Sequence, residues 1–180
     1  GSGDLARRRL IPALYNLLLD GLLPSNYAVI GLGRKSMTDE EFRATVREGV
    51  LTHSRQALAE DTWKDFSQHL FFVSGENENP NTYAKLKSRA EEIERTLKLP
   101  GNRIFYLSIP PSSFSSVCEG LEQAGLATKP AAQAPYARII VEKPVGRDLP
   151  SAKAINQVTG RVFDESQIFR IDHYLGKETV

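Results

Sequence analysis

The alternation of apolar runs with amphipathic segments limits the fold of this chain more than any other feature. Five runs have the length and apolar content of strands: residues 27–31, 70–73, 103–109, 138–142 and 167–170. They are apolar along most of their length rather than alternating, which is typical of strands buried on both faces. Because helical patterns separate them, the sequence predicts an α/β fold with a parallel sheet covered by helices on both faces.

Helices are predicted for residues 5–20, 82–99, 112–124 and 148–162, and another begins at Thr38. Glu41 stands three residues after Thr38, the spacing of a capping box. This helix carries the apolar residues Phe42, Val46, Val50 and Leu51. Pro12 should kink the first helix or end its first turn, and Gly21 should stop that helix.

Composition excludes several classes of protein. A length of 180 residues suits one domain, and a formal net charge of +1 implies no field for non-specific nucleic-acid binding. The single cysteine, Cys118, excludes an intrachain disulfide, fits a reducing compartment, and is expected to be inert and buried in a helix. No apolar run approaches the length of a membrane span. His53 and His69 lack cysteines or acids at ligand spacing, so we assign no metal.

Ligands of such parallel sheets bind beyond the carboxyl ends of the strands. These ends are residues 31–35, 74–77, 108–111, 142–146 and 172–177. We therefore look for chemistry at these five places and at the glycine-rich start of the chain.

The chain starts with Gly1-Ser2-Gly3-Asp4 directly before the first helix. Glycines let the backbone approach a pyrophosphate, and the amides at a helix N-terminus attract its charge. The alternative is that Gly1-Ser2 is a cloning scar, since no strand precedes it. Three arginines follow, and helical spacing allows one or two of them at most to face a site, with Arg9 the best candidate.

Arg34-Lys35 follows the first predicted strand, where a dinucleotide fold meets the adenosine ribose. A carboxylate at this position would bind the 2′-hydroxyl of NAD, whereas an arginine suits the 2′-phosphate of NADP. Arg34 therefore indicates NADP, and the alternative is an ordinary solvated loop.

Lys143 follows the buried run 138–142 and would lie at the mouth of the sheet, where it could contact a substrate hydroxyl or a coenzyme. The alternative is an ordinary turn.

The most unusual chemistry is in residues 170–178, which bring together Asp172, His173 and Lys177. A carboxylate can orient a histidine base, and a histidine with a lysine can hold a phosphate dianion. This run indicates half of an active site.

These motifs together resemble glucose-6-phosphate dehydrogenase. The resemblance is carried, in the right order, by Gly3-Asp4-Leu5-Ala6, Arg103 to Ser108 with Pro110-Pro111, Glu142-Lys143-Pro144-Val145-Gly146 and the run from Arg170 to Glu178. It implies a Rossmann-like, doubly wound parallel sheet that lacks its first strand. Residues 1–180 would be an NADP-binding domain truncated at both ends, without the second, substrate and oligomerisation domain.

The resemblance implies oxidation of glucose 6-phosphate to 6-phosphogluconolactone, with hydride transfer to NADP, as the entry to the pentose phosphate pathway of glucose metabolism. Ser2 and Gly3 would line the coenzyme diphosphate, and Arg34 would hold the 2′-phosphate. Lys143 would reach both coenzyme and sugar. His173 and Lys177 would bind the substrate phosphate, and Asp172 would orient a base histidine that lies downstream of this chain.

The sequence departs from the family pattern at Arg9, where the family usually has a lysine that contacts the substrate. Arginine keeps the charge but changes the geometry, so the family's role for this position is assigned to Arg9 only weakly. The parent is expected to be cytoplasmic and homo-oligomeric through its other domain, with no nucleic-acid or membrane partner. The fragment alone is expected to be inactive. A non-catalytic nucleotide- or sugar-phosphate-binding module is the alternative. A generic NADP reductase domain would leave Asp172, His173 and Lys177 unexplained.

Overall fold

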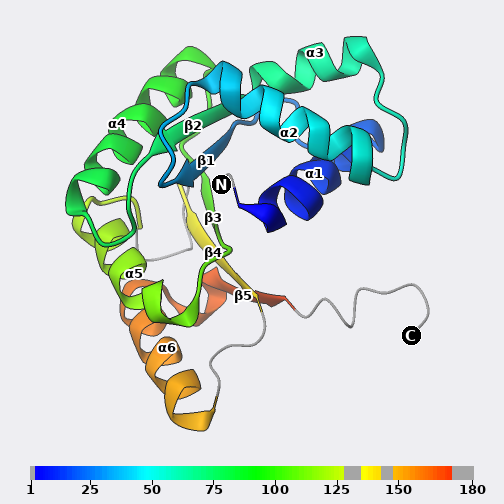
Figure 1. Ribbon diagram of the computed structural model, residues 1–180. Coiled ribbons are helices and arrows are strands. Elements are labelled where there is room, and N and C mark those ends of the chain that lie inside the picture. Colours follow the sequence, from blue (N-terminus) through cyan, green and yellow to red (C-terminus); the bar gives the residue numbers. More distant parts are fainter. Residues whose placement is uncertain (1–2, 128–134, 143–147, 172–180) are drawn as a thin grey trace. The chain divides into compact units, whose positions relative to one another are not determined.

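The computed structural model describes residues 3–127, 135–142 and 148–171 (Figure 1). The chain divides into two compact units, Gly1–Glu76 with Ser88–Leu99, and Asn77–Lys87 with Pro100–Val180. The predicted α/β fold is confirmed, since all three described strand pairs are parallel.

The first unit contains η1 (Ala6–Leu10), α1 (Ile11–Leu19), β1 (Val29–Gly33), α2 (Asp39–His53), α3 (Glu60–Gln68) and β2 (Leu70–Ser74). Helix α4 (Pro80–Thr96) contributes to both units. The second unit contains β3 (Arg103–Leu107), η2 (Pro111–Ser113), α5 (Phe114–Gln123), β4 (Ala137–Glu142), α6 (Leu149–Val162), η3 (Glu165–Gln167) and β5 (Ile168–Ile171).

The strands form two sheets within the described residues, one of β1 and β2 and one in the order β3-β4-β5. Every described pair in each sheet is parallel and the strands alternate with helices along the chain, which agrees with the predicted doubly wound α/β fold.

The π-helical turn η1 leads directly into α1, and Pro12 lies in the first turn of α1. Helix α1 ends at Leu19, and Gly21, two residues later, adopts a φ of +67°. The Leu22 N–H then donates to the Leu17 carbonyl at 2.8 Å, as in a Schellman motif.

Helix α2 begins with the predicted capping box. The Glu41 N–H donates to Thr38 Oγ1 at 3.2 Å, and the Thr38 N–H donates to Glu41 Oε2 at 2.8 Å. Of the apolar residues on this helix, Phe42, Val46 and Val50 are buried, whereas Leu51 is 56% exposed. The buried residues are spaced by four, and Leu51 is turned about 100° from Val50.

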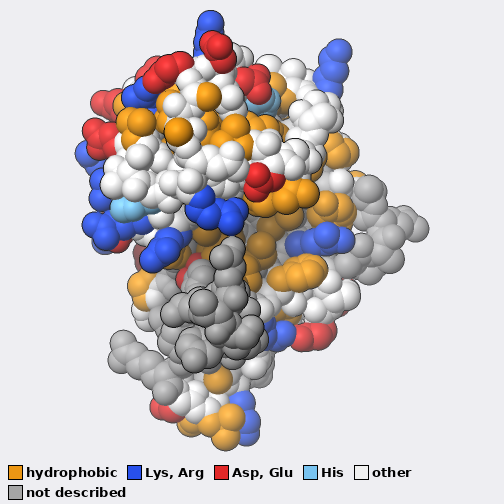
Figure 2. Space-filling model, turned by 90° about the vertical axis from the view of Figure 1, so that its right-hand side faces the viewer, with side chains coloured by type: hydrophobic (Ala, Val, Ile, Leu, Met, Phe, Trp, Pro, Cys, Tyr) orange, Lys and Arg blue, Asp and Glu red, His pale blue; other side chains and the backbone are white. Residues whose placement is uncertain are grey.

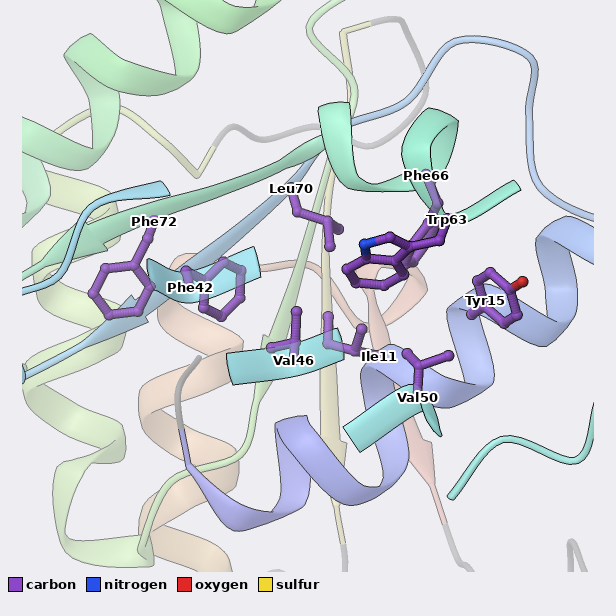
Figure 3. Close-up of a cluster of buried hydrophobic side chains, with 9 residues drawn as sticks. All are labelled: Ile11, Tyr15, Phe42, Val46, Val50, Trp63, Phe66, Leu70 and Phe72. Atoms are coloured by element: carbon purple, nitrogen blue, oxygen red, sulfur yellow. The ribbon is translucent and has the colours of Figure 1, made fainter. Parts of the chain in front are cut away.

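The core of the first unit combines α1, α2, α3 and β2 (Figure 3). Its nine members are Ile11, Tyr15, Phe42, Val46, Val50, Trp63, Phe66, Leu70 and Phe72. The rings of Phe42 and Phe72 lie side by side with centroids 5.1 Å apart. They pack against Gly31, where an added Cβ would lie 2.8 Å from the Phe42 ring. Gly31 is thus a packing residue in the middle of β1, which explains why ending the predicted strand there was wrong.

The outer edge of β2 is closed by side chains. The N–H of Phe72 donates to Asp39 Oδ1 at 2.7 Å, and Arg43 Nε donates to the Leu70 carbonyl at 3.0 Å. The other oxygen of Asp39 accepts from Arg89 at 2.6 Å. These bonds satisfy backbone groups that an edge strand would otherwise offer to another chain.

One further helix and the ends of two other elements differ from the prediction. Helix α3 was not predicted, because only Trp63 and Phe66 of its nine residues are buried. Helix α4 ends at Thr96 rather than residue 99, since Lys98 takes a left-handed φ of +54°. Strand β3 ends at Leu107, two residues before the predicted end.

In the second unit, α5 and α6 pack against each other on one side of the sheet (Figure 1). Cys118 on α5 is fully buried, as predicted, and burial raises the pKa of its thiol to about 11. The opposite face carries Ile104 and Phe169, which are 58% and 46% exposed. Among the described residues, no helix is long and apolar enough to cross a membrane.

Candidate functional site

The carboxyl ends of the strands lie at one edge of each sheet, because the strands of each sheet are parallel. In the first unit this edge carries Arg34, directly after β1. In the second unit β4 ends at Glu142 and β5 at Ile171, and these two residues are register partners. The segments that begin with Lys143 and Asp172 therefore leave the sheet from adjacent positions.

Five of the predicted site residues lie outside the described residues: Ser2, Lys143, Asp172, His173 and Lys177. Their roles stay predictions. What the structure does describe is the sheet edge from which Lys143 and Asp172 continue.

Gly3 lies at the start of the first helix, where its carbonyl accepts from the Arg7 N–H at 3.1 Å. It is exposed, and an added Cβ would meet nothing within 4 Å. Packing therefore gives no reason for glycine here, which leaves room for a ligand's close approach as an explanation.

The three arginines after Gly3 differ in their partners. Arg8 pairs with Asp4 at 2.8 Å, and Arg7 lies 3.6 Å from the same carboxylate. Arg9 is exposed and makes no ion pair within the part of the chain that the structure describes. Among the described contacts, Arg9 is thus the arginine of the three whose charge is not paired, and its role in the site stays a prediction.

Arg34 and Lys35 are exposed at the carboxyl end of β1. Their loop is tied to the end of β2, since Ser74 Oγ donates to the Lys35 carbonyl at 3.3 Å and the Gly75 N–H donates to the Gly33 carbonyl at 2.9 Å. Arg34 makes no ion pair among the described residues. A guanidinium held on an anchored loop without an acidic partner is suited to bind a phosphate.

Among the described residues, the loop that follows β1 offers no free carboxylate to a ribose hydroxyl. Residues 34–38 contain no acid, and the first one that follows is Asp39. Both oxygens of Asp39 are engaged, by the Phe72 N–H at 2.7 Å and by Arg89 at 2.6 Å. The donor set therefore fits a 2′-phosphate better than a 2′-hydroxyl.

Sequence reasoning missed one polar contact at the edge of the second unit. Tyr106, near the end of β3, donates its hydroxyl to Glu142 Oε1 on β4. Burial, followed by the hydrogen bond and charge of Glu142, raises the pKa of Tyr106 above its ordinary range. The signal available in the sequence was a tyrosine close to the end of one predicted strand and a glutamate at the end of the next.

The other titratable groups that the structure describes do not form a metal site. Within the described ranges, no group of three or more His, Cys, Asp or Glu residues could hold a metal ion. His69 stacks on Tyr27 with centroids 4.6 Å apart, which is a packing role. On the face drawn in Figure 2, positive and negative side chains are interspersed among hydrophobic ones.

Comparison with known proteins matches this chain along its whole length to one family. Residues 1–180 match the family described as "Glucose-6-phosphate dehydrogenase, NAD binding domain". A glucose-6-phosphate 1-dehydrogenase from Chlamydia pneumoniae is 41% identical over 180 residues, and one from Bacillus subtilis is 36% identical over 179. Each alignment covers 99% of this chain and 35% of the relative.

Solved structures give the same result. A glucose-6-phosphate dehydrogenase in complex with its substrate glucose-6-phosphate matches with a TM-score of 0.82 and 34% identity. The enzyme from Mycobacterium avium matches with a TM-score of 0.80 and 30% identity. Both matches cover 98% of this chain and 36% of the solved one. The chain thus spans about a third of the length of the proteins that it matches.

Proposed function

Since this chain belongs to the glucose-6-phosphate dehydrogenase family, as the nicotinamide-dinucleotide-binding domain, we propose that a protein carrying it oxidises glucose 6-phosphate at its C1 hydroxyl. The product would be 6-phosphogluconolactone, and the hydride would pass to NADP, as at the entry to the pentose phosphate pathway. The observation that carries this proposal is the register pairing of Glu142 with Ile171. Glu142 and Ile171 directly precede Lys143 and Asp172 in the chain.

The substrate would be held by the side chains that follow this edge. We assign the sugar phosphate to His173 and Lys177, which can supply N–H donors and positive charge to a dianion. Lys143 would contact the sugar hydroxyls and the coenzyme. Asp172 would orient a histidine base that accepts the hydroxyl proton, and it would favour the imidazolium form that results.

The coenzyme would lie along the carboxyl ends of the strands. Gly3 and Ser2 would line the diphosphate at the start of the first helix, with Arg9 nearby, and Arg34 would hold the 2′-phosphate. When bound, the nicotinamide ring supplies the hydride acceptor. Preference for NADP over NAD is supported by the exposed Arg34 and by the engagement of Asp39 with Arg89 and the Phe72 amide.

We further propose that residues 1–180 act as one coenzyme-binding domain of a longer, cytoplasmic and homo-oligomeric enzyme. The base that Asp172 would orient is not assigned within residues 1–180. The isolated fragment should therefore bind nucleotide without turnover, and measurable dehydrogenase activity of a pure 1–180 preparation would contradict this.

The test is an assay of the full-length protein with glucose 6-phosphate, glucose and fructose 6-phosphate, followed by the absorbance of the reduced coenzyme. Oxidation of glucose 6-phosphate should far exceed that of the other two sugars. Lys177→Ala should raise the KM for glucose 6-phosphate, whereas Lys153→Ala, an exposed lysine of α6, should leave it unchanged. Binding of nucleotide with no turnover of any sugar phosphate would favour a non-catalytic module instead.

A further inference from the structure

Tyr106 and Glu142 form a side-chain bridge at the carboxyl edge of the second unit. Tyr106 is the register partner of Ile140, and Glu142 lies two residues further along β4. Residues two apart on a strand point to the same face, so Tyr106 and Glu142 share one face of the sheet. The Tyr106 hydroxyl donates to Glu142 Oε1 across the two strands.

This bridge is a strong one for its type. Hydrogen bonds to an ionised carboxylate are shorter and about twice as strong as neutral ones. Both side chains are half-buried, which weakens competition from water. Because burial and Glu142 raise the pKa of Tyr106, its hydroxyl remains a donor at neutral pH and well above it.

Strand pairing alone does not require the bridge. The backbones of β3 and β4 are already in register from Arg103 with Ala137 to Leu107 with Val141. Glu142 lies one residue beyond the last of these pairs and is the final residue of β4. The backbone of Glu142 also pairs with Ile171 of β5, so the bridge adds a side-chain link to β3 at the last residue before Lys143.

We propose that Tyr106 is a positioning residue of the dehydrogenase site, which holds Glu142 and thereby the start of the Lys143 segment in the orientation that turnover needs. This rests on the proposed function of Lys143. Tyr106 acts through Glu142 and is not assigned any contact with substrate or coenzyme.

The test uses the full-length enzyme with Tyr106→Phe, Glu142→Gln and the double variant. Tyr106→Phe should lower kcat/KM for glucose 6-phosphate about tenfold, mainly through kcat, because misplaced groups slow the reaction itself. The double variant should be no slower than Glu142→Gln alone, since residues that act through one bond are not additive. The control Tyr136→Phe removes a tyrosine hydroxyl just before β4, at the opposite end of that strand from Glu142. It should change neither kcat nor kcat/KM.

Unfolding midpoints separate positioning from folding. Tyr106→Phe should unfold at the wild-type midpoint. If it does not, Glu142→Gln, which keeps the size of the side chain but replaces the charge-assisted bond with a weaker neutral one, should show the kcat loss at an unchanged midpoint. A wild-type kcat in both variants, or losses that add in the double variant, would overturn the proposal while the proposed function stands. Absence of glucose 6-phosphate oxidation by the wild type would overturn both.

Discussion

Replacing Gly120 with alanine tests the packing of the second unit most sharply. Gly120 is buried in α5, and an added Cβ would lie 2.2 Å from Cε2 and 2.4 Å from Cδ2 of the Tyr83 ring. The ring is 2% exposed, and its hydroxyl donates to the Asn77 carbonyl at 2.7 Å. Tyr83 is therefore held at both ends and cannot simply turn aside.

The expected magnitude is a balance of two effects. Alanine is favoured over glycine in a helix interior by about 1 kcal/mol. Overpacking of a buried site costs roughly 1–3 kcal/mol, and a separation this far below van der Waals contact falls at the upper end. We expect Gly120→Ala to lower the free energy of unfolding by about 1–2 kcal/mol, which is on the order of 2–8 °C in Tm for a chain of this size.

Gly160→Ala in α6 is the matched control, because an added Cβ there would meet nothing within 4 Å. This change should raise stability by up to about 1 kcal/mol. Urea and thermal unfolding followed by far-ultraviolet circular dichroism would measure both variants. A Gly120→Ala protein as stable as Gly160→Ala would refute the packing argument.

Two further predictions concern the core and the sheet edge. Asp39→Ala should lower the free energy of unfolding by about 1–3 kcal/mol, because the Phe72 N–H and Arg89 lose their acceptor. The control Glu92→Ala removes only the exposed partner of Arg89, so it should lower the free energy of unfolding by less in the same urea titration. Burial raises the pKa of the Cys118 thiol to about 11 in the native state, against an ordinary 9.0. Between pH 9 and 11 the unfolded state therefore loses this proton first, and the free energy of unfolding falls as the pH rises. Cys118→Ala should flatten that part of the pH profile, and identical slopes with and without the thiol would contradict the assignment.

Local signals could be predicted from the sequence, because they depend on residues close together in the chain. The capping box of Thr38 and Glu41 needs only three residues of spacing, and the structure has both of its bonds. Gly21 and Gly125 end their helices with φ of +67° and +66°. Helix caps and helix ends of this kind depend on residues within one helical turn of one another.

Features that depend on pairing between strands could not be predicted. Gly31 was taken as the end of a strand, whereas it lies in the middle of β1 and is required by the Phe42 and Phe72 rings from distant segments. The bond between Tyr106 and Glu142 depends on the register of β3 with β4, which spacing along the chain does not give. The same holds for the adjacency of Glu142 and Ile171.

The candidate site shows the same division. Arg34 was identified from its place after a strand, and the structure places it there, exposed and without an acidic partner among the described residues. The engagement of Asp39, the first acid after β1, could not be predicted, because it depends on Arg89 from a helix 50 residues away in sequence. These three-dimensional contacts support the proposed preference for NADP.

The proposed preference for NADP through Arg34 is tested most directly by measuring kcat/KM of the full-length enzyme for NADP and for NAD. The wild type and Arg34→Ala are compared with the control Arg95→Ala, which removes an exposed arginine of α4. Loss of a charge-assisted bond to the 2′-phosphate should lower kcat/KM for NADP roughly 10- to 100-fold. The value for NAD, which lacks that phosphate, should change less than about twofold, and Arg95→Ala should match wild type. Equal losses for the two coenzymes in Arg34→Ala would contradict the account.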